Sequence, residues 1–301
     1  MPTLLLTGSS GFVGSHLVNH LRSKFEIDAL TTSDTKIKGV RNQYKWSEIG
    51  SIEGKYDVVI HMAGLAHDTQ NNRLESEYFE VNEGLTKLLM ANAERWSIQS
   101  FIYLSSIKAV VDSTADKIID ETMESTATHV YGRSKLSAEK AILKQDSNFS
   151  KVILRPVMIY GKGQKGNLKT LEKWIRNGFV FPFGKWENKR SVLSINNLSY
   201  CIESIVSNPI SSGTYFIADD DPVSTVDILQ YIGKGINKKV RFVGVPNSVI
   251  QFGLKLLPKK LKSITDKVLG SLIVDNKKLK TALHIKQMPF QTSTELPAAI
   301  D

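Results

Sequence analysis

The chain has 301 residues, of which 41% are hydrophobic and 23% are charged, which is ordinary for a globular protein with a buried core. It has one cysteine (Cys201), no run of 18 apolar residues and no basic segment before its first apolar stretch, so we expect no intrachain disulfide, membrane association or signal peptide, and a cytoplasmic location. The net charge is +9, but the basic residues are scattered without a nucleic-acid-binding motif, so we expect a phosphate-bearing small molecule as partner and no nucleic acid.

Short apolar strands alternate with helical patterns along the first two-thirds of the chain, as in a parallel sheet covered by helices. Strands are predicted over residues 3–7, 26–31, 57–60, 100–105, 151–154 and 213–218, and helices over 12–24, 75–96 and 129–145. After Pro156, glycines and prolines interrupt the pattern, which indicates a second, smaller lobe.

Three glycines follow the first strand and open the first helix, in the order Thr-Gly-Ser-Ser-Gly-Phe-Val-Gly. Such a turn lets the backbone approach a pyrophosphate, whose charge faces the helix N-terminus. Glycines also form ordinary turns, but here the strand–turn–helix context of the motif is present. We therefore predict a dinucleotide cofactor held by Gly8, Ser10, Gly11, Phe12, Val13 and Gly14.

A phenol and an ammonium stand four residues apart at Tyr131 and Lys135, on one face of a predicted helix. A tyrosine with an ordinary pKa near 10 is a poor base at neutral pH, and a nearby lysine cation is expected to lower that pKa. A tyrosine and a lysine at this spacing are also commonly a packed ring beside a solvated chain. Downstream of a phosphate-binding turn, we interpret them as the central acid/base pair of an enzyme.

These motifs resemble the short-chain dehydrogenase/reductase superfamily, in particular its extended, nucleotide-sugar-modifying branch, the NAD-dependent epimerase/dehydratase family. The resemblance extends over about residues 3–217 and includes the segments 57–64, 81–84 (Val-Asn-Glu-Gly), 154–156 and 160–163. It implies an α/β fold: a Rossmann-type doubly wound parallel sheet with a smaller C-terminal substrate-binding lobe, and a homodimer. Residues 1–165 would form the dinucleotide-binding Rossmann domain, with 191–217 returning to it, and 166–190 and 218–301 the lobe. Further cofactor contacts are implied for Ala63, Gly64, Asn82, Tyr131 and Lys135.

The resemblance also implies a hydroxyl that bonds the reacting oxygen at the end of the strand over residues 100–105. It assigns this role to Ser106, with Ser105 as the alternative, although a serine at a strand end also satisfies local backbone groups. The residues that follow, Ala109-Val110-Val111, replace the family's usual Val-Tyr-Gly, and Lys108 stands close by. This departure points away from the most familiar epimerases and dehydratases.

The end of the second predicted strand bears on the choice of cofactor. An NAD-selective site offers an acid there to hold the ribose diol, whereas this chain has Thr31-Thr32-Ser33 and its nearest acid, Asp34, comes about two positions late. Hydroxyls such as Thr32, with Lys36, Lys38 and Arg41 nearby, favour the 2′-phosphate of NADP(H). NAD(H) stays open if Asp34 moves inward.

The resemblance places the diphosphate of a nucleotide sugar near Asn167 and Arg190, and a guanidinium suits paired phosphate oxygens. The segments around Ser106, Asn167 and Arg190 resemble a bacterial polysaccharide subgroup. We therefore expect a reductase at C4 of a UDP-4-keto-6-deoxy-N-acetylhexosamine, with a UDP-N-acetylhexosamine or UDP-glucose 4-epimerase as the alternative. A cofactor-sensing binding protein is the non-enzymatic alternative, and it would not need Tyr131 and Lys135. No histidine stands at metal-ligand spacing, so we expect no metal.

Overall fold

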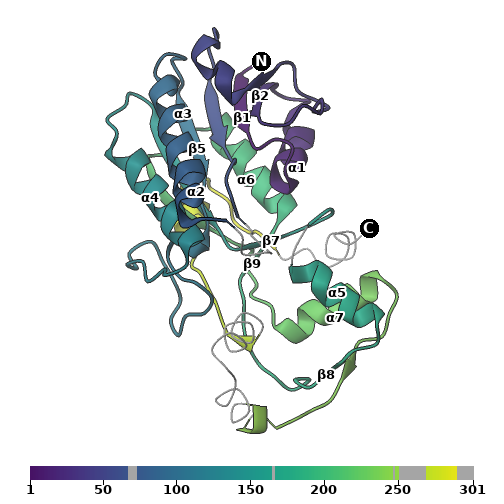
Figure 1. Cartoon of the computed structure of the whole chain (residues 1–301). Coiled ribbons are helices and arrows are strands. Elements are labelled where there is room, and N and C mark those ends of the chain that lie inside the picture. The colour runs from purple at the N-terminus through teal and green to yellow at the C-terminus, as the bar shows by residue number, and fades with distance from the viewer. Residues whose placement is uncertain (67–72, 165–166, 247, 251–268, 290–301) are drawn as a thin grey trace.

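The computed structural model describes residues 1–66, 73–164, 167–246, 248–250 and 269–289. Seven parallel strands form the central sheet in the order β10-β6-β5-β4-β1-β2-β3 (Figure 1). Their bounds are β1 Thr3–Thr7, β2 Glu26–Thr31, β3 Gln43–Lys45, β4 Val58–His61, β5 Ser100–Leu104, β6 Ser150–Pro156 and β10 Gly213–Ile217. The order reverses between β1 and β4, and open parallel α/β sheets commonly bind their ligands at the carboxyl ends of the strands at such a reversal.

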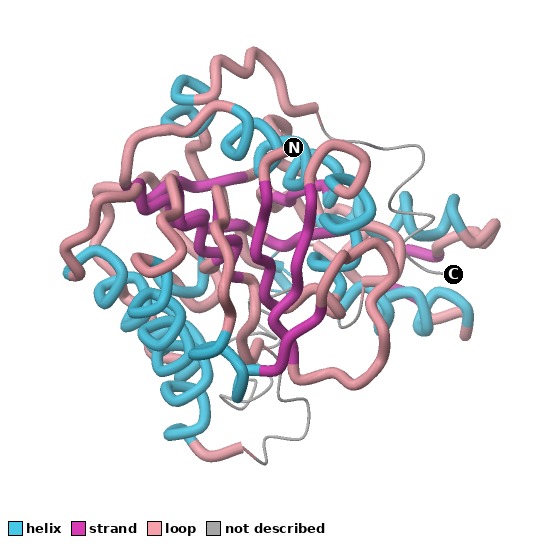
Figure 2. Tube along the Cα trace, turned by 90° about the horizontal axis from the view of Figure 1, so that it is seen from above, coloured by secondary structure: helices cyan, strands magenta, loops and turns pink. Residues whose placement is uncertain are grey.

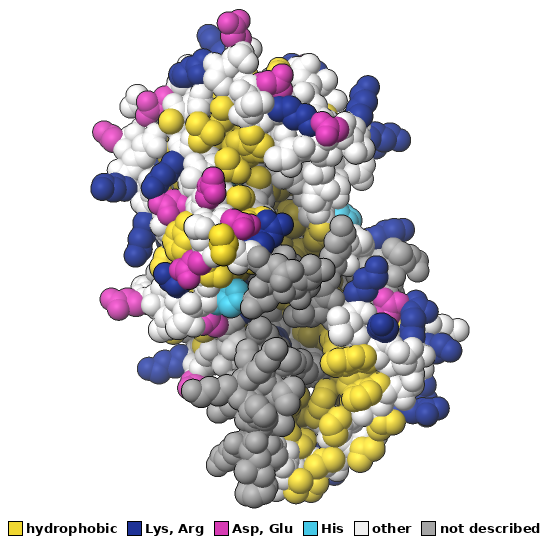
Figure 3. All heavy atoms as spheres, viewed as in Figure 1, with side chains coloured by type: hydrophobic (Ala, Val, Ile, Leu, Met, Phe, Trp, Pro, Cys, Tyr) yellow, Lys and Arg dark blue, Asp and Glu magenta, His cyan; other side chains and the backbone are white. Residues whose placement is uncertain are grey.

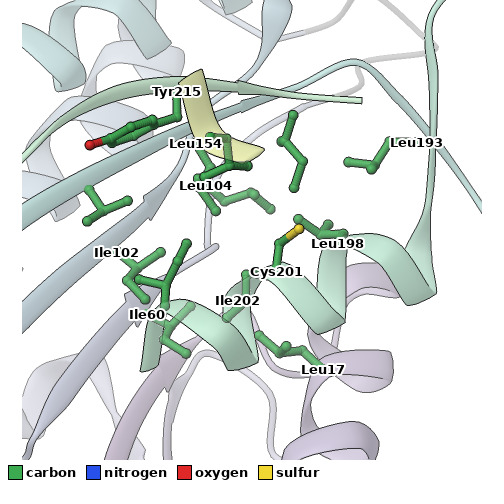
Figure 4. Packing of buried hydrophobic residues seen from close by; sticks show 14 of the residues in the cluster. Leu17, Ile60, Ile102, Leu104, Leu154, Leu193, Leu198, Cys201, Ile202 and Tyr215 are labelled. Atoms are coloured by element: carbon green, nitrogen blue, oxygen red, sulfur yellow. The ribbon is translucent and has the colours of Figure 1, made fainter. Parts of the chain in front are cut away.

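Helices cover both faces of the sheet, as the view from above shows (Figure 2). One face carries α1 (Phe12–Leu21) and α6 (Ile195–Ser207), and the other carries α3 (Leu85–Ala93) and α4 (Val130–Lys144). Successive side chains of a strand point to opposite faces, so Leu4 and Leu6 of β1 join the first core while Leu5 joins the second. Figure 4 shows the first core, with Leu17 and Cys201 packed beneath the strands. The predicted doubly wound α/β fold is confirmed.

A smaller lobe has its own core and lies below the carboxyl ends of the strands (Figure 1). It contains α5 (Asn167–Arg176), α7 (Thr225–Gly235) and a two-stranded sheet of β8 (Val180–Phe181) and β11 (Arg241–Phe242). A second short sheet pairs β7 (Met158–Tyr160) with β9 (Val192–Ser194), and α10 (Lys277–Ala282) contacts β10. In Figure 3, hydrophobic side chains gather on this lobe at the lower right, whereas basic and acidic side chains intermingle above it.

Several elements differ from the sequence prediction, which named neither α6 nor the elements of the smaller lobe. The helix predicted over residues 75–96 is α2 (Glu75–Phe79) and α3 joined by a π-helical turn over Glu80–Gly84, and such turns recur at functional sites. The edge strand β3 was not predicted, because its three residues, Gln43 to Lys45, are only half-buried and show no apolar alternation. None of the helices in the described ranges is long and apolar enough to cross a membrane.

Candidate active site

The predicted catalytic residues and most of the predicted cofactor-binding residues lie at the carboxyl ends of β1, β4 and β5, because parallel strands present these ends at one edge of the sheet; Thr32, Asn167 and Arg190 lie elsewhere. The glycine turn follows β1, Met62 to Leu65 follow β4, and the two serines follow β5. The first turn of α4, which carries Tyr131, packs against the short 3₁₀ turn Ile107–Ala109 behind these serines.

The glycine turn fits a pyrophosphate. A Cβ at Gly14 would lie 2.2 Å from the carbonyl oxygen of Gly8, so only glycine lets α1 begin this close to the turn. The N-cap residue of α1 is Gly11, so no side chain caps the backbone N–H groups there. The first turn of the helix, which begins with Phe12 and Val13, contains no acidic residue. The helix therefore presents its positive end to the turn without a side chain of its own to neutralise it.

The phenol of Tyr131 interacts with the hydroxyl of Ser106, and both residues are half-buried. Burial raises the pKa of Tyr131, and the bond from Ser106 opposes that rise. The pKa of Tyr131 is therefore raised by the cost of burying a phenolate, and not lowered by Lys135 as we expected from the sequence. Gly132 makes the juxtaposition possible, because a Cβ there would lie 2.0 Å from the carbonyl oxygen of Lys108 in the 3₁₀ turn.

Lys135 is almost fully buried one turn further along α4, with 4% of its surface exposed. Its Nζ donates hydrogen bonds to Oη of Tyr103 at 3.1 Å and to the carbonyl oxygen of Leu104 at 2.8 Å. Burial lowers the pKa of Lys135 to about 7, while Glu139, one turn further along, acts to raise it. Lys135 is thus poised between its charged and neutral forms near neutral pH.

The two adjacent serines at the end of β5 have different surroundings. Ser105 is buried, and its hydroxyl donates a hydrogen bond to Glu139, whose carboxylate is also held by Arg155 on β6 at 2.6 Å. Ser106 accepts a bond from the backbone N–H of Lys108 at 3.1 Å and faces Tyr131. Ser106 therefore satisfies a local backbone group and also faces the phenol, while the bond to a reacting oxygen that the resemblance implies for it stays a prediction.

The loop after β4 is fastened to α4 by Asn82, which lies in the π-helical turn. Its side chain accepts a bond from the N–H of Leu65 at 2.8 Å, and donates to the carbonyl oxygen of Leu65 at 3.0 Å and to the hydroxyl of Ser134 at 2.9 Å. Asn82 is fully buried, so it supports the loop that carries Ala63 and Gly64. The sequence motif located Asn82, but only the structure shows these partners.

A pocket of about 360 Å³ lies between α1 and the loop after β2. Three cations, Arg22, Lys36 and Lys38, line this pocket, and no acid does. The full lining is Ser9, Ser10, Ser15, Val18, Asn19, Arg22, Ser33, Thr35, Lys36, Ile37 and Lys38. Thr32 is exposed at the end of β2, and Asp34 is bound by Lys45 instead of lining this pocket. Arg41, which we expected near the end of β2 with Lys36 and Lys38, does not line this pocket and instead pairs with the buried carboxylate of Asp28 at 2.9 Å. The sequence prediction missed Arg22, which does line it.

Arg190 joins three segments of the chain. Its backbone bridges Val223 and Leu272, and its guanidinium donates to the carbonyl oxygens of Gly270 at 2.6 Å and Ser113 at 3.3 Å. These bonds use two of the five N–H donors of an arginine. Asn167 is the first residue of α5, and its side chain is outside the described part of the structure.

A cavity of about 870 Å³ lies between residues 115–118 and the smaller lobe, and none of the predicted site residues lines it. Its lining mixes lysines (Lys117, Lys185, Lys189) with acids (Asp116, Glu187, Asp227). In the described residues, no three His, Cys, Asp or Glu side chains are placed to share a metal ion.

Comparisons with known proteins agree with this geometry. A family model described as the 3-beta hydroxysteroid dehydrogenase/isomerase family matches residues 5–242. The chain is 33% identical to a UDP-glucose 4-epimerase of Vibrio cholerae, over 97% of this chain and 92% of that protein. It is 26% identical to an N-acetyl-alpha-D-glucosaminyl-diphospho-ditrans,octacis-undecaprenol 4-epimerase of Escherichia coli O157:H7, over 81% of this chain and 75% of that protein. The solved structure of the Bordetella bronchiseptica enzyme WbmG in complex with NAD and UDP superposes with a TM-score of 0.75 at 16% identity, covering 98% of this chain and 92% of WbmG.

Proposed function

Because the chain belongs to the 3-beta hydroxysteroid dehydrogenase/isomerase family, within the short-chain dehydrogenase/reductase superfamily, we propose that it is a nicotinamide-dependent enzyme that acts at C4 of a UDP-linked hexose or N-acetylhexosamine. One observation carries this proposal: Tyr131, Ser106 and Lys135 meet at the strand ends beside a glycine turn that fits a dinucleotide. A cofactor-sensing protein would have no use for the buried lysine, whose charge is costly to bury.

The three side chains divide the proton chemistry among them. The Tyr131 phenol, whose pKa is raised by burial, gives a proton to a substrate carbonyl oxygen or takes one from the hydroxyl at that position. Ser106 holds the same oxygen by a hydrogen bond, and the ammonium of Lys135 stabilises the phenolate while it exists. A bound nicotinamide supplies the hydride transfer at the same carbon.

We propose 4-epimerisation as the reaction, because both curated relatives named above are 4-epimerases, one of them acting on UDP-glucose. An epimerase oxidises and then reduces the same carbon, so it regenerates its cofactor in each cycle and benefits from tight binding. WbmG, with the same fold, was solved with NAD and UDP, which supports a nicotinamide and a uridine diphosphate as the ligands here.

Reduction at C4 of a UDP-4-keto-6-deoxy-N-acetylhexosamine is the second candidate, and the pocket beside α1 favours it. This pocket offers Arg22, Lys36 and Lys38 without an acid, and Asp34 is bound by Lys45. Such a lining suits the 2′-phosphate of NADPH better than a free ribose diol. A reductase consumes one hydride for each product, so its cofactor must be released and replaced.

Purified protein incubated with UDP-glucose, UDP-N-acetylglucosamine and a UDP-4-keto-6-deoxy-N-acetylhexosamine, with and without NADH and NADPH, distinguishes the two reactions. Interconversion of C4 epimers without added cofactor supports the epimerase. Stoichiometric consumption of NADPH with the keto-sugar supports the reductase. Tyr131→Phe is the control: it should lose at least about a hundredfold in turnover, the usual contribution of a general acid, while keeping cofactor affinity. Near-normal turnover of this variant would overturn the proposed function in either form.

A matched pair of variants tests the cofactor pocket. Lys36→Ala should weaken binding of 2′,5′-ADP by roughly tenfold and leave binding of 5′-AMP unchanged, because it removes one charge-assisted contact. Lys55→Ala, on the exposed segment before β4, is the control and should change neither affinity. Equal binding of the two nucleotides by the unmodified protein, measured by calorimetry, contradicts the NADP preference.

A further inference from the structure

A row of buried polar side chains runs from the end of β1 to the amine of Lys135. It consists of Thr7 on β1, His61 on β4, Thr86 on α3 and Tyr103 on β5, and none of the four is exposed. His61 Nδ1 lies 2.6 Å from the hydroxyl of Thr7, and its Nε2 lies 2.9 Å from the hydroxyl of Thr86. Thr86 also interacts with the hydroxyl of Tyr103, which lies 3.1 Å from Lys135 Nζ.

The surrounding bonds fix where the protons of this row lie. The Thr7 hydroxyl oxygen accepts the backbone N–H groups of Met62 at 3.2 Å and Ala63 at 3.0 Å, so its own proton goes to Nδ1 of His61. His61 then carries its proton on Nε2 and donates it to Thr86, whose hydroxyl donates to the carbonyl oxygen of Asn82 at 2.6 Å. The row is therefore uncharged and its hydrogen bonds are directed.

Lys135 needs such fixed acceptors, because burial favours its neutral amine. Its Nζ lies 4.4 Å from the centre of the Tyr103 ring, within reach of a cation–π interaction, besides donating to Tyr103 Oη. The Leu104 carbonyl is the second acceptor that bonds it. Both contacts stabilise the ammonium relative to the amine.

The other ionisable groups facing this amine cannot replace Tyr103. On α4, Tyr131 lies one turn before Lys135 and Glu139 one turn after it, and Glu139 is already paired with Arg155 on β6. From β4, His61 faces it, and burial lowers the pKa of His61 to about 3, so it stays neutral at working pH.

We propose that Tyr103 is a positioning residue that keeps the amine of Lys135 in place and charged, and thereby sets the pH range over which Tyr131 can work. This inference rests on the proposed function. Tyr103 never touches the reacting atoms; it acts through Lys135. A tyrosine that merely filled the core beneath the sheet would leave the pH dependence of turnover unchanged when its hydroxyl is removed.

Tyr103→Phe keeps the ring and removes only the hydroxyl. The Lys135 ammonium then loses an acceptor, so its pKa falls, and the alkaline limb of kcat should move to lower pH by about one unit, with kcat itself lower by roughly tenfold. The dissociation constant of the cofactor should change by less than about threefold. Thr86→Val, which removes the hydroxyl beside Tyr103, should shift the limb in the same direction and serves if Tyr103→Phe does not fold.

Tyr56→Phe is the matched control, because Tyr56 is another buried tyrosine of the same core, whose hydroxyl donates to Asp28 at 2.9 Å. It should lower the stability and leave the pH profile of kcat unchanged. A Tyr103→Phe profile that overlays that of the unmodified enzyme overturns the inference. If Tyr131→Phe is inactive in the same assays, the proposed function survives that outcome; if Tyr131→Phe is fully active, the proposed function itself has failed.

Discussion

Adjacent residues at the end of β5 show how strongly the role of a side chain depends on what faces it. Ser105 and Ser106 are chemically identical, yet Ser105 is enclosed with Glu139 and Arg155 whereas Ser106 faces the Tyr131 phenol. Side chains of consecutive residues in extended backbone point to opposite sides, so one hydroxyl enters the protein and the other enters the site.

This difference predicts opposite effects of two matched variants. Ser106→Ala should lower kcat by roughly ten- to a hundredfold with little change in stability, because it removes a bond to the reacting oxygen. Ser105→Ala should lower the free energy of unfolding by about 1–3 kcal/mol, because it leaves the buried Glu139 short of a donor. Steady-state kinetics and urea unfolding measure both effects. A larger loss of kcat in Ser105→Ala would reverse the assignment.

Because His61 is buried, we expect the free energy of unfolding to depend on pH. Burial lowers its pKa to about 3 in the folded protein, from an ordinary value of 6.5. Between pH 3 and 6.5, His61 is therefore protonated in the unfolded chain and neutral in the folded protein. The free energy of unfolding is then highest above about pH 6.5 and decreases as the pH falls. The expected slope is about 1.4 kcal/mol for each pH unit below 6.

The measurement is the free energy of unfolding in urea at several pH values between 7.5 and 5, compared with His61→Gln. That variant should be less stable at pH 7.5, because it loses the bonds to Thr7 and Thr86, but its stability should depend less on pH. Equal slopes for the two proteins would show that His61 takes up a proton in the folded state.

At the scale of elements, the site depends on how closely α4 approaches the 3₁₀ turn after β5. Gly132 is the point of contact, with the position of a Cβ only 2.0 Å from the carbonyl oxygen of Lys108. The π-helical turn at Glu80–Gly84 provides a second attachment, because Asn82 bonds both the loop after β4 and Ser134 of α4. The helix that carries Tyr131 and Lys135 is thus fastened to the sheet at two places.

Gly132→Ala should therefore separate Tyr131 from Ser106. We expect kcat to fall by at least about tenfold, since misplacing a catalytic group by an ångström can cost up to a hundredfold, while cofactor binding at the glycine turn after β1, which Gly132 does not contact, is retained. Gly50→Ala is the control, because a Cβ at Gly50 would meet nothing within 4 Å. Cofactor fluorescence titration and kinetics of both variants test this, and unchanged kcat in Gly132→Ala would contradict it.

At the scale of the whole molecule, Arg190 connects the smaller lobe to the Rossmann core. Its guanidinium donates hydrogen bonds to the carbonyl oxygen of Ser113, in the segment after β5, and to that of Gly270, in the C-terminal part of the chain. Burial lowers the pKa of Arg190, so the protein holds a cation at this junction at some cost. We interpret this as a site prepared for an anionic group between the two parts.

Arg190→Ala should weaken binding of UDP by roughly ten- to a hundredfold, the usual effect of removing one charge-assisted contact. Arg176→Ala is the control in the same lobe, because the half-exposed guanidinium of Arg176 pairs with the buried carboxylate of Glu172 on α5 and its removal should leave UDP affinity unchanged. Calorimetry with UDP measures both variants. Unchanged affinity in Arg190→Ala would show that the diphosphate binds elsewhere. Light scattering on the same samples tests a separate expectation, the homodimer implied by the resemblance.

The sequence by itself determined the features that depend on neighbouring residues. The strand, the glycines and the helix that open the chain are contiguous, so with the later motifs they carried the resemblance to the family and to the doubly wound fold that it implies, and both are confirmed. Tyr131 and Lys135 lie on one helix, so their common face followed from its period. The catalytic, cofactor and substrate roles of individual residues stay predictions.

Only the tertiary structure decided the features that depend on distant segments. It placed Glu139 and Arg155 behind β5, where Ser105 bonds Glu139, and it placed Tyr103 beside Lys135 from 32 residues away. It also paired Asp34 with Lys45, away from the pocket beside α1. No local pattern encodes these choices, because a buried polar group takes whichever partner the packing of remote strands and helices brings within hydrogen-bond distance.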